Sequence, residues 1–394
     1  MIKTALAPGR ATVLLIILLT LTHCANQSND KGVILDNVVF SSDFLGGKLD
    51  HISKKENGYI AYIQPAHEPV NKSPYYAFSV ASSSTKEIEL TLNYGEYAHR
   101  YIPKLSRDRI NWTTIEQDKI RIDKNTGEAT LTLKISKSPL FVAAQEITST
   151  ADTNKWIEQQ LSFSAFLRLD TIGFSVQKRP LTVINSGGTS KKAIVLIARQ
   201  HPPEIPGGTI AFNTFFETLM VKDELANKFR DKFNIITFPM PNPDGVDLGY
   251  WRHNANGVDL NRDWIAFTQP ETKAIKAYLE SFSEQELDIK FAVDFHTSYS
   301  GPYLLTLDDQ NQSQSDKTTA KWIFEIEKNS FFRVEEKKRS QNLPYGYNYF
   351  FNQFGSEAVT YEEGDEVNRG IIRERAKVYA HHLMKVLLAN NSDE

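Results

Sequence analysis

From about residue 170 onward, the chain alternates between short apolar segments and longer segments with helical periodicity. The segment 193–198 is a continuous apolar run, which is typical of a strand buried on both faces. Alternation of this kind predicts an α/β layer structure built on a largely buried sheet. Further strand patterns occur at 234–238, 289–295 and 358–361, and helical patterns occur at 210–233, 271–282, 316–328 and 369–388.

The preceding part of the chain, from residue 32 to about 165, carries mostly strand patterns. Residues 129–135 alternate with a period of two, and turn residues separate the candidate strands. A β-sandwich is the simplest architecture for such a series. The other clear strand patterns are short and rich in aromatic or β-branched residues, at 59–63, 75–80 and 88–92.

The N-terminus resembles a bacterial lipoprotein signal. Lys3 and Arg10 precede an apolar run too short to span a bilayer comfortably, and Cys24 and a polar stretch follow it. His23 departs from the small residue that is usual before such a cysteine, so a plain secretion signal with an incidental Cys24 is the alternative. Both alternatives predict export, to the periplasm or to the outer membrane through a lipid on Cys24. We predict a signal at 1–23, a linker at 24–35, an all-β sandwich domain at 36–168 and a second domain at 169–394.

The composition excludes two kinds of chemistry. With one cysteine, the chain cannot build an internal disulfide framework or a thiolate metal cluster. The 45 basic and 48 acidic residues give a net charge of −3, which provides no general attraction for nucleic acid.

Two histidines and a glutamate follow predicted strands of the second domain. His201 and Glu204 lie three residues apart after the strand 193–198, and His296 ends the strand that begins at 289. In open α/β sheets, ligands gather at the carboxyl ends of strands. Two histidines and one glutamate are a ligand set of catalytic zinc, which leaves a fourth position for water.

Further motifs occur between these residues. Asn242-Pro243-Asp244-Gly245 precedes Gly257-Val258-Asp259-Leu260-Asn261-Arg262. The order H-x-x-E, N-P-D-G, G-x-D-x-N-R and then a lone histidine after a strand resembles the zinc metallocarboxypeptidase family over about residues 170 to 390. The resemblance implies a mixed sheet with helices on both faces, a bound Zn²⁺ ion held by His201, Glu204 and His296, and hydrolysis of peptides.

The resemblance also implies a catalytic glutamate at the end of a strand. Thr360-Tyr361-Glu362 fits the family context, and Glu363 is the competing assignment. Because side chains alternate along a strand, only one of the two can face the metal, and we prefer Glu362. By the same resemblance, Arg252 stabilises charge on the scissile carbonyl oxygen and Asp259 orients a zinc-binding histidine.

Substrate contacts are implied in the same way. Asn261 and Arg262 would bind the terminal carboxylate of a peptide, and the planar fork of arginine suits this role. The family also carries a tyrosine on a loop before the catalytic glutamate, for which Tyr345 and Tyr347 are both candidates. Spacing does not choose between these two tyrosines, although we take Tyr347 as the substrate-binding one.

A subgroup resemblance extends to the first half of the chain. The sandwich patterns and Ala198-Arg199-Gln200-His201-Pro202-Pro203-Glu204 are similar to cytosolic-carboxypeptidase-like members, with Pro203 in place of a glycine. The export signal departs from that subgroup, so we do not carry over its intracellular substrates.

We therefore expect a zinc exopeptidase that acts outside the cytoplasm on peptides with a free carboxylate, and cell-wall peptides are one candidate class. A zinc amidase or deacylase of acidic or cell-wall peptides is an alternative. A non-catalytic binding protein on the same fold is a third, which the presence of Glu204, His296 and Glu362 disfavours.

Overall fold

The computed structural model describes residues 32–283, 286–308 and 317–390, which belong to one compact unit. The predicted signal sequence and Cys24 lie outside the described residues. Over the described ranges, no helix combines the length and the apolar character needed to cross a bilayer.

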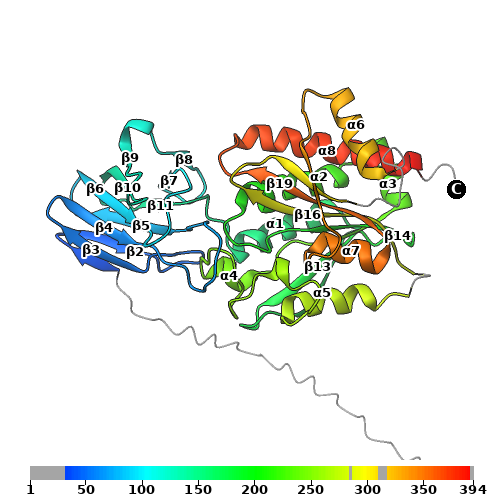
Figure 1. Cartoon of the computed structure of the whole chain (residues 1–394), viewed down its shortest axis with the longest axis horizontal. Coiled ribbons are helices and arrows are strands. Elements are labelled where there is room, and N and C mark those ends of the chain that lie inside the picture. The colour runs from blue at the N-terminus through cyan, green and yellow to red at the C-terminus, as the bar shows by residue number, and fades with distance from the viewer. Residues whose placement is uncertain (1–31, 284–285, 309–316, 391–394) are drawn as a thin grey trace, which may run out of the picture. The chain divides into compact units, whose positions relative to one another are not determined.

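Residues 33–143 form two sheets that share one hydrophobic core, and we call this part the N-terminal sandwich (Figure 1). The first sheet has the order β1-β2-β5-β11-β7-β8 and the second has the order β3-β4-β6-β10-β9. Phe78 of β5 and Leu131 of β10 lie in the same core, which confirms the predicted sandwich architecture. The strands are β1 Val33–Leu35, β2 Val38–Ser41, β3 His51–Lys55, β4 Gly58–Tyr62, β5 Ala77–Ser82, β6 Lys86–Asn93, β7 Lys104–Ser106, β8 Thr113–Thr114, β9 Ile120–Ile122, β10 Ala129–Ile135 and β11 Leu140–Ala143.

One helix departs from the strand patterns of this half. Helix α1, Thr150–Phe163, begins at Ser149, whose side chain accepts a hydrogen bond from Asp152 in a capping box. Helix α1 buries only Ile157 and Gln160. Its apolar positions are therefore too few to produce a visible helical period, and the expectation of strands up to about 165 is wrong here. At the other end, β1 falls inside the range predicted as a linker.

An eight-stranded mixed sheet forms the rest of the molecule, with the order β12-β13-β15-β14-β16-β19-β17-β18. Strands β15, β14, β16 and β19 run parallel, and β12 and β13 pair antiparallel with their neighbours. Strand β17 is antiparallel to β19 and parallel to β18. The mixed sheet predicted from the motifs is confirmed. Its strands are β12 Arg168–Phe174, β13 Pro180–Asn185, β14 Lys192–Ile197, β15 Asn234–Phe238, β16 Asp288–Ser298, β17 Tyr303–Leu307, β18 Glu336–Arg339 and β19 Glu357–Gly364.

Helices cover both faces of this sheet (Figure 1). Ile194 and Leu196 of β14 belong to one apolar cluster with α2, α6 and α8, whereas Val195 and Ile197 belong to another with α5 and α7. Alternate residues of one strand thus serve two cores, which explains why β14 has no polar face. The helices are α2 Phe212–Met220, α3 Glu224–Lys232, α4 Pro243–Asp247, α5 Pro270–Glu280, α6 Thr318–Asn329, α7 Gly346–Phe354 and α8 Arg369–Asn390.

Two differences from the predicted elements matter for the site. The segment 210–233 contains two helices, because the chain leaves helical geometry at Val221 and Asp223 caps a new helix through the backbone N–H of Ala226. Strand β19 continues to Gly364 and therefore includes both Glu362 and Glu363. The carboxyl ends of β14, β16 and β19 lie side by side, so they bring three distant stretches of sequence to one edge.

Candidate active site

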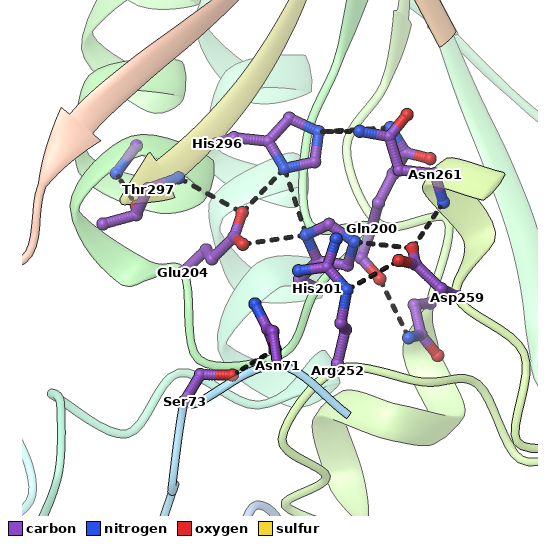
Figure 2. A network of polar contacts seen from close by, with 12 residues as sticks. Asn71, Ser73, Gln200, His201, Glu204, Arg252, Asp259, Asn261, His296 and Thr297 are labelled. Atoms are coloured by element: carbon purple, nitrogen blue, oxygen red, sulfur yellow. Dashed lines mark hydrogen bonds and ion pairs between the residues drawn. The ribbon is translucent and has the colours of Figure 1, made fainter. Parts of the chain in front are cut away.

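Two histidines and one glutamate converge at this edge of the sheet. Glu204 lies between the two rings, with Oε1 2.8 Å from His201 Nδ1 and Oε2 2.7 Å from His296 Nδ1. The two Nδ1 atoms are 3.2 Å apart (Figure 2). All three side chains are buried or nearly so, and their ligand atoms lie within 4.8 Å of one another. The structure thus brings together the three residues predicted to hold a metal.

Gly207 allows the loop that carries His201 and Glu204 to lie close to the strand that carries His296. His201 and Glu204 lie between β14 and a short π-helix, Pro206–Ala211, while His296 lies in β16. A Cβ atom on Gly207 would stand 1.7 Å from the carbonyl oxygen of His296. The backbone N–H of Gly207 also donates to Thr297 Oγ1 at 2.8 Å. The loop therefore packs directly on β16 at the metal-binding residues.

Each histidine has a carboxylate at its other ring nitrogen. His201 Nε2 is 2.9 Å from Asp259 Oδ1, and His296 Nε2 is 3.0 Å from Asp294 Oδ2. A carboxylate only accepts hydrogen bonds, so a ring that donates its Nε2 proton to Asp259 or Asp294 keeps a lone pair on Nδ1 for a cation. Both Nδ1 lone pairs and the oxygens of Glu204 then point at one another.

This convergence of acceptors fits a divalent cation. Burial acts to lower the pKa of His296, but Asp294 and Glu204 outweigh it and raise that pKa well above its usual range. Burial would raise the pKa of Glu204, but His201 and His296 hold it far below its usual range. The cluster therefore demands positive charge at its centre. Two imidazole nitrogens and a carboxylate match the donors of a catalytic zinc site, so the residues present fit Zn²⁺.

Glu362 faces this cluster and Glu363 does not. In the parallel register of β16 and β19, Glu362 pairs with His296 and Thr360 pairs with Asp294. Glu363 points to the other side, where it accepts hydrogen bonds from Tyr361 at 2.7 Å and from Arg375 at 2.5 Å. The Oε2 atom of Glu362 is buried and has no partner among the described residues. The geometry therefore places Glu362, and not Glu363, beside the candidate metal site.

The environment of Glu362 favours its protonated form. Burial raises the pKa of this carboxyl to about 8. His296 and Arg252 act to lower it, whereas the negative charges of Glu204 and Asp294 raise it further. Burial and like charges shift carboxyl pKa values upward in this way at sites that transfer protons.

Asp259 connects the cluster to the predicted arginines. Its Oδ2 accepts from Arg252 Nε at 2.6 Å, and Arg262 Nη1 lies 3.7 Å from the same oxygen. The backbone N–H of Asn261 donates to Asp259 Oδ1 at 2.9 Å. Burial would raise the pKa of Asp259, but His201 and Arg252 bring it far below its usual range, so the group is a carboxylate.

Asn261 and Arg262 occupy different environments. Asn261 is buried, with Nδ2 3.2 Å from His296 Nε2 and with Oδ1 accepting from the backbone N–H of Gly346 at 3.0 Å. The side chain of Arg262 is 45% exposed, and its guanidinium lies 4.3 Å from the centre of the Tyr345 ring. Arg262 therefore keeps donors available to a ligand, whereas most of the Asn261 amide is engaged within the protein.

The two candidate tyrosines also differ. Tyr345 is partly buried and forms the aromatic surface under Arg262. Tyr347 is buried in α7, and its hydroxyl has no hydrogen-bond partner within the described part of the chain. Burial raises the pKa of Tyr347 strongly, so its hydroxyl stays protonated and can donate. The structure places both tyrosines near Arg262, with ring centres 5.8 Å apart.

A model of the zinc carboxypeptidase family matches residues 153–366 of this chain. The matched segment contains the whole cluster described above and exceeds half of the 394 residues. The chain belongs to the zinc carboxypeptidase family. The family uses Zn²⁺, which agrees with the donor set of His201, Glu204 and His296.

Curated relatives of this chain include cytosolic carboxypeptidase 6 of Caenorhabditis elegans. That protein is 32% identical over 170 residues, which cover 40% of this chain and 37% of the relative. Cytosolic carboxypeptidase 6 of Mus musculus is 28% identical over 35% of this chain and 27% of the relative. The chain thus matches well under half of the length of these relatives.

Solved structures share the fold over a larger part of the chain. A metallo-carboxypeptidase from Burkholderia cenocepacia has a TM-score of 0.74 at 20% identity, covering 91% of this chain and 99% of that one. A carboxypeptidase A-like protein from Shewanella denitrificans has a TM-score of 0.72 at 19% identity, covering 88% and 97%. These similarities confirm the predicted fold, including its N-terminal β-rich part.

The sequence motifs left two residues of the candidate site unassigned. Asp294 holds His296 as Asp259 holds His201, and Gln200 donates to Asp294 Oδ2 at 2.7 Å. The spacing Asp294-x-His296 in a strand was a usable signal, because residues two apart in a strand share a face. Gln200 offered no signal, since only the folded loop brings it to Asp294.

The Asn-Pro-Asp-Gly motif binds the backbone of the loops that carry His201 and Arg252. Asn242 Nδ2 donates to the carbonyls of Gln200 and His253 at 3.0 and 3.1 Å, and its Oδ1 caps α4. Asp244 is fully buried and paired with Arg179 at 2.7 Å. The motif therefore fixes the loops on either side of His201 and Arg252 and contacts none of the three predicted metal ligands.

Proposed function

We propose that this protein is a zinc-dependent exopeptidase that hydrolyses the C-terminal peptide bond of its substrates. One observation carries the proposal: the Nδ1 atoms of two histidines and the carboxylate of Glu204 converge on one point, and Glu362 stands beside them on the neighbouring strand. In this proposal, His201, Glu204 and His296 hold Zn²⁺. Bound zinc supplies a Lewis acid and lowers the pKa of water toward neutrality.

The chain's own groups supply the remaining chemistry. In its carboxylate form Glu362 accepts a proton from the attacking water and then delivers it to the leaving amine, and the raised pKa favours holding that proton between the two steps. Arg252 is held by Asp259 through Nε alone, so its terminal nitrogens stay available to the scissile carbonyl oxygen. Asp259 and Asp294 hold the two imidazole rings in orientation.

The C-terminus of the substrate is recognised on the side of the site where Arg262 lies. Arg262 is partly exposed above Tyr345 and presents a planar fork that matches a carboxylate. We assign the terminal carboxylate of the substrate mainly to the partly exposed Arg262, with the Nδ2 group of Asn261 and the protonated hydroxyl of Tyr347 as secondary donors. A site that requires a free carboxylate beside the scissile bond removes residues from the C-terminus and does not cut internally.

Release of C-terminal residues from a peptide library tests this function. The purified protein with one bound zinc is expected to release amino acids from free peptides and to leave C-terminally amidated copies intact. Equal cleavage of amidated peptides would contradict the role of Arg262. Cleavage restricted to acyl groups on acidic amides would favour the amidase alternative, and tight peptide binding without hydrolysis would favour the binding protein.

We also propose that the mature protein is exported and anchored by a lipid on Cys24, which makes peptides outside the cytoplasm its substrates. The charged start, the apolar run and Cys24 of residues 1–24 support this proposal. Labelling with a radioactive fatty acid in a bacterial host is expected to mark the native chain and not the variant Cys24→Ser. Unlabelled protein in the cytoplasm would contradict both export and anchoring.

A further inference from the structure

The residue before Arg252 is inserted into the core of the N-terminal sandwich. Trp251 is 2% exposed and packs in the apolar cluster formed by the strands of both sandwich sheets. Its ring meets Tyr97 edge-on, with centres 5.1 Å apart. The hydroxyl of Ser73, which Figure 2 shows together with the site, donates to the carbonyl of Trp251 at 3.3 Å.

The neighbours on either side of this tryptophan and arginine contact the sandwich as well. The ring of His67 packs against Tyr250 at 5.2 Å and against His253 at 6.1 Å between ring centres. The segment that presents Arg252 is therefore fixed on both sides by residues of the sandwich, although it belongs to the loops of the mixed sheet.

The strand that carries Glu362 is held by the sandwich at its end. Arg100 binds Asp365 with two hydrogen bonds, Nε to Oδ2 at 2.8 Å and Nη2 to Oδ1 at 3.1 Å. Glu366 accepts from the backbone N–H of Ile102 at 2.9 Å and from Lys104 Nζ at 2.7 Å. Asp365 lies three residues beyond Glu362.

The Arg100–Asp365 pair is largely buried and directional. Asp365 and Lys104 are 3% and 4% exposed, and the backbone N–H of Asp365 donates to the carbonyl of Ser298, two residues beyond His296. A buried ion pair adds little net stability because both charges lose their hydration, but a two-bonded arginine–carboxylate pair fixes geometry closely. Arrangements of this kind determine the position of a segment more than they contribute to folding free energy.

We propose that the N-terminal sandwich positions two groups of the catalytic site: it fixes the position of Arg252 through Trp251 and the position of Glu362 through Asp365. The inference rests on the proposed function, in which Arg252 and Glu362 are the groups that act on the substrate. His201, Glu204 and His296 all come from the mixed sheet and its loops, so none of the metal ligands belongs to the sandwich. Positioning and metal binding can therefore be measured separately, as kcat and as zinc content.

The first test compares Trp251→Leu with Phe78→Leu in the full chain. Both residues are buried aromatics of the same core, and Phe78 belongs to strand β5, whereas Trp251 is the direct neighbour of Arg252 in the chain. Assays are run well below the lower melting temperature, on protein carrying one zinc. Since small misplacements of reacting groups cost up to about 100-fold, we expect Trp251→Leu to lower kcat by about 10- to 100-fold with little change in KM. Phe78→Leu is expected to keep the native kcat.

The second test compares Arg100→Ala with Arg107→Ala. Arg107 donates to the carbonyls of Ser138 and Lys134 inside the sandwich and serves as the matched control. We expect Arg100→Ala to lower kcat with zinc content unchanged, and we expect added guanidinium ions to restore part of the loss. Arg107→Ala is expected to retain native kcat.

Three outcomes would overturn the inference: native kcat in Trp251→Leu and Arg100→Ala, equal losses in the matched controls, or loss of zinc in proportion to activity. An inactive wild-type protein with bound zinc would instead count against the proposed function. If the wild-type protein is active and Trp251→Leu and Arg100→Ala keep its kcat, the positioning role of the sandwich is contradicted and the proposed function stands.

Discussion

The N-terminal sandwich and the mixed sheet use their strands in opposite ways. In β10, buried residues alternate with more exposed ones, so each strand serves one core. In β16, every residue from Ile289 to Thr297 except Lys290 is buried, and Asp294 and His296 are among them. A charged side chain inside a strand that is buried on both faces is costly unless a partner is present. The buried charged residues of the mixed sheet occur with partners, such as Asp294 with His296 and Glu363 with Arg375, whereas the polar residues of β10 occupy its more exposed positions.

Substitution of Glu362 by glutamine is the largest expected effect on activity. Loss of the proton-accepting group should lower kcat by about 10²- to 10⁴-fold, while metal analysis should still find one zinc. Glu363→Gln is the neighbouring control, since Glu363 binds Tyr361 and Arg375 on the other face of β19. The variant Glu363→Gln is expected to have a lower melting temperature and a native kcat. A native kcat in Glu362→Gln would break the assignment.

In the sandwich, a core substitution should affect stability alone. Leu131→Ala removes a fully buried side chain of β10, and its expected cost is about 2 to 5 kcal/mol of unfolding free energy. The exposed Lys134→Ala on the same strand should stay within about 0.5 kcal/mol. Urea denaturation measures both. At temperatures where Leu131→Ala is folded, its kcat should equal that of the native protein, and a fall in kcat there would contradict the prediction.

Asp294→Asn tests the carboxylate that holds His296. The variant keeps the shape of the side chain and weakens its attraction for the Nε2 proton, so zinc affinity should fall by about 10- to 100-fold. Competition with a coloured chelator gives this affinity. Asp288→Asn at the start of the same strand is the control, because the Asp288 carboxylate pairs with the partly exposed Lys290. Equal zinc affinities in all three proteins would show that Asp294 has no role in metal binding.

The smallest expected effect is a pH dependence that arises in the sandwich. Burial, with Lys104 nearby, lowers the pKa of His99 from 6.5 to about 4, so the folded chain keeps the ring neutral. The unfolded chain binds the proton first, and stability is therefore complete above pH 6.5 and falls as the pH drops toward 4. His99→Gln should reduce the loss of unfolding free energy between pH 7 and pH 5 by about 2 kcal/mol.

Urea titrations at both pH values test this difference. His51→Gln provides the control, since His51 is exposed in β3 of the same sandwich. An acid response in His99→Gln as large as that of the native chain would assign the effect to other groups.

Much of the fold was readable from local patterns because each strand type leaves a distinct signature. The period of two in β10 and the continuous apolar run of β14 predicted a half-buried and a fully buried strand, and both predictions are confirmed. Helix α1 was missed because its stability comes from a capping box and two buried residues, which produce almost no periodicity. The break between α2 and α3 was missed because the apolar pattern continues across Asp223.

The site was predictable in its residue types but not in its connections. His201, Glu204 and His296 stood out through their positions after strands, and the structure brings them together. The choice of Glu362 over Glu363 required the register of β19 against β16, which no local pattern contains. The contacts of Arg100 with Asp365, and of Trp251 with the sandwich core, span more than one hundred residues of sequence and appear only in the folded chain.

The absent side chain at Gly207 has a consequence for how the centre is assembled. His201 and Glu204 lie on a loop, and His296 lies on a strand. The backbones of the loop and the strand touch at Gly207, because glycine has a hydrogen atom where every other residue has a Cβ. A larger residue at this position would push the loop away from the strand and would separate His201 and Glu204 from His296, so that the three side chains could no longer bind one ion.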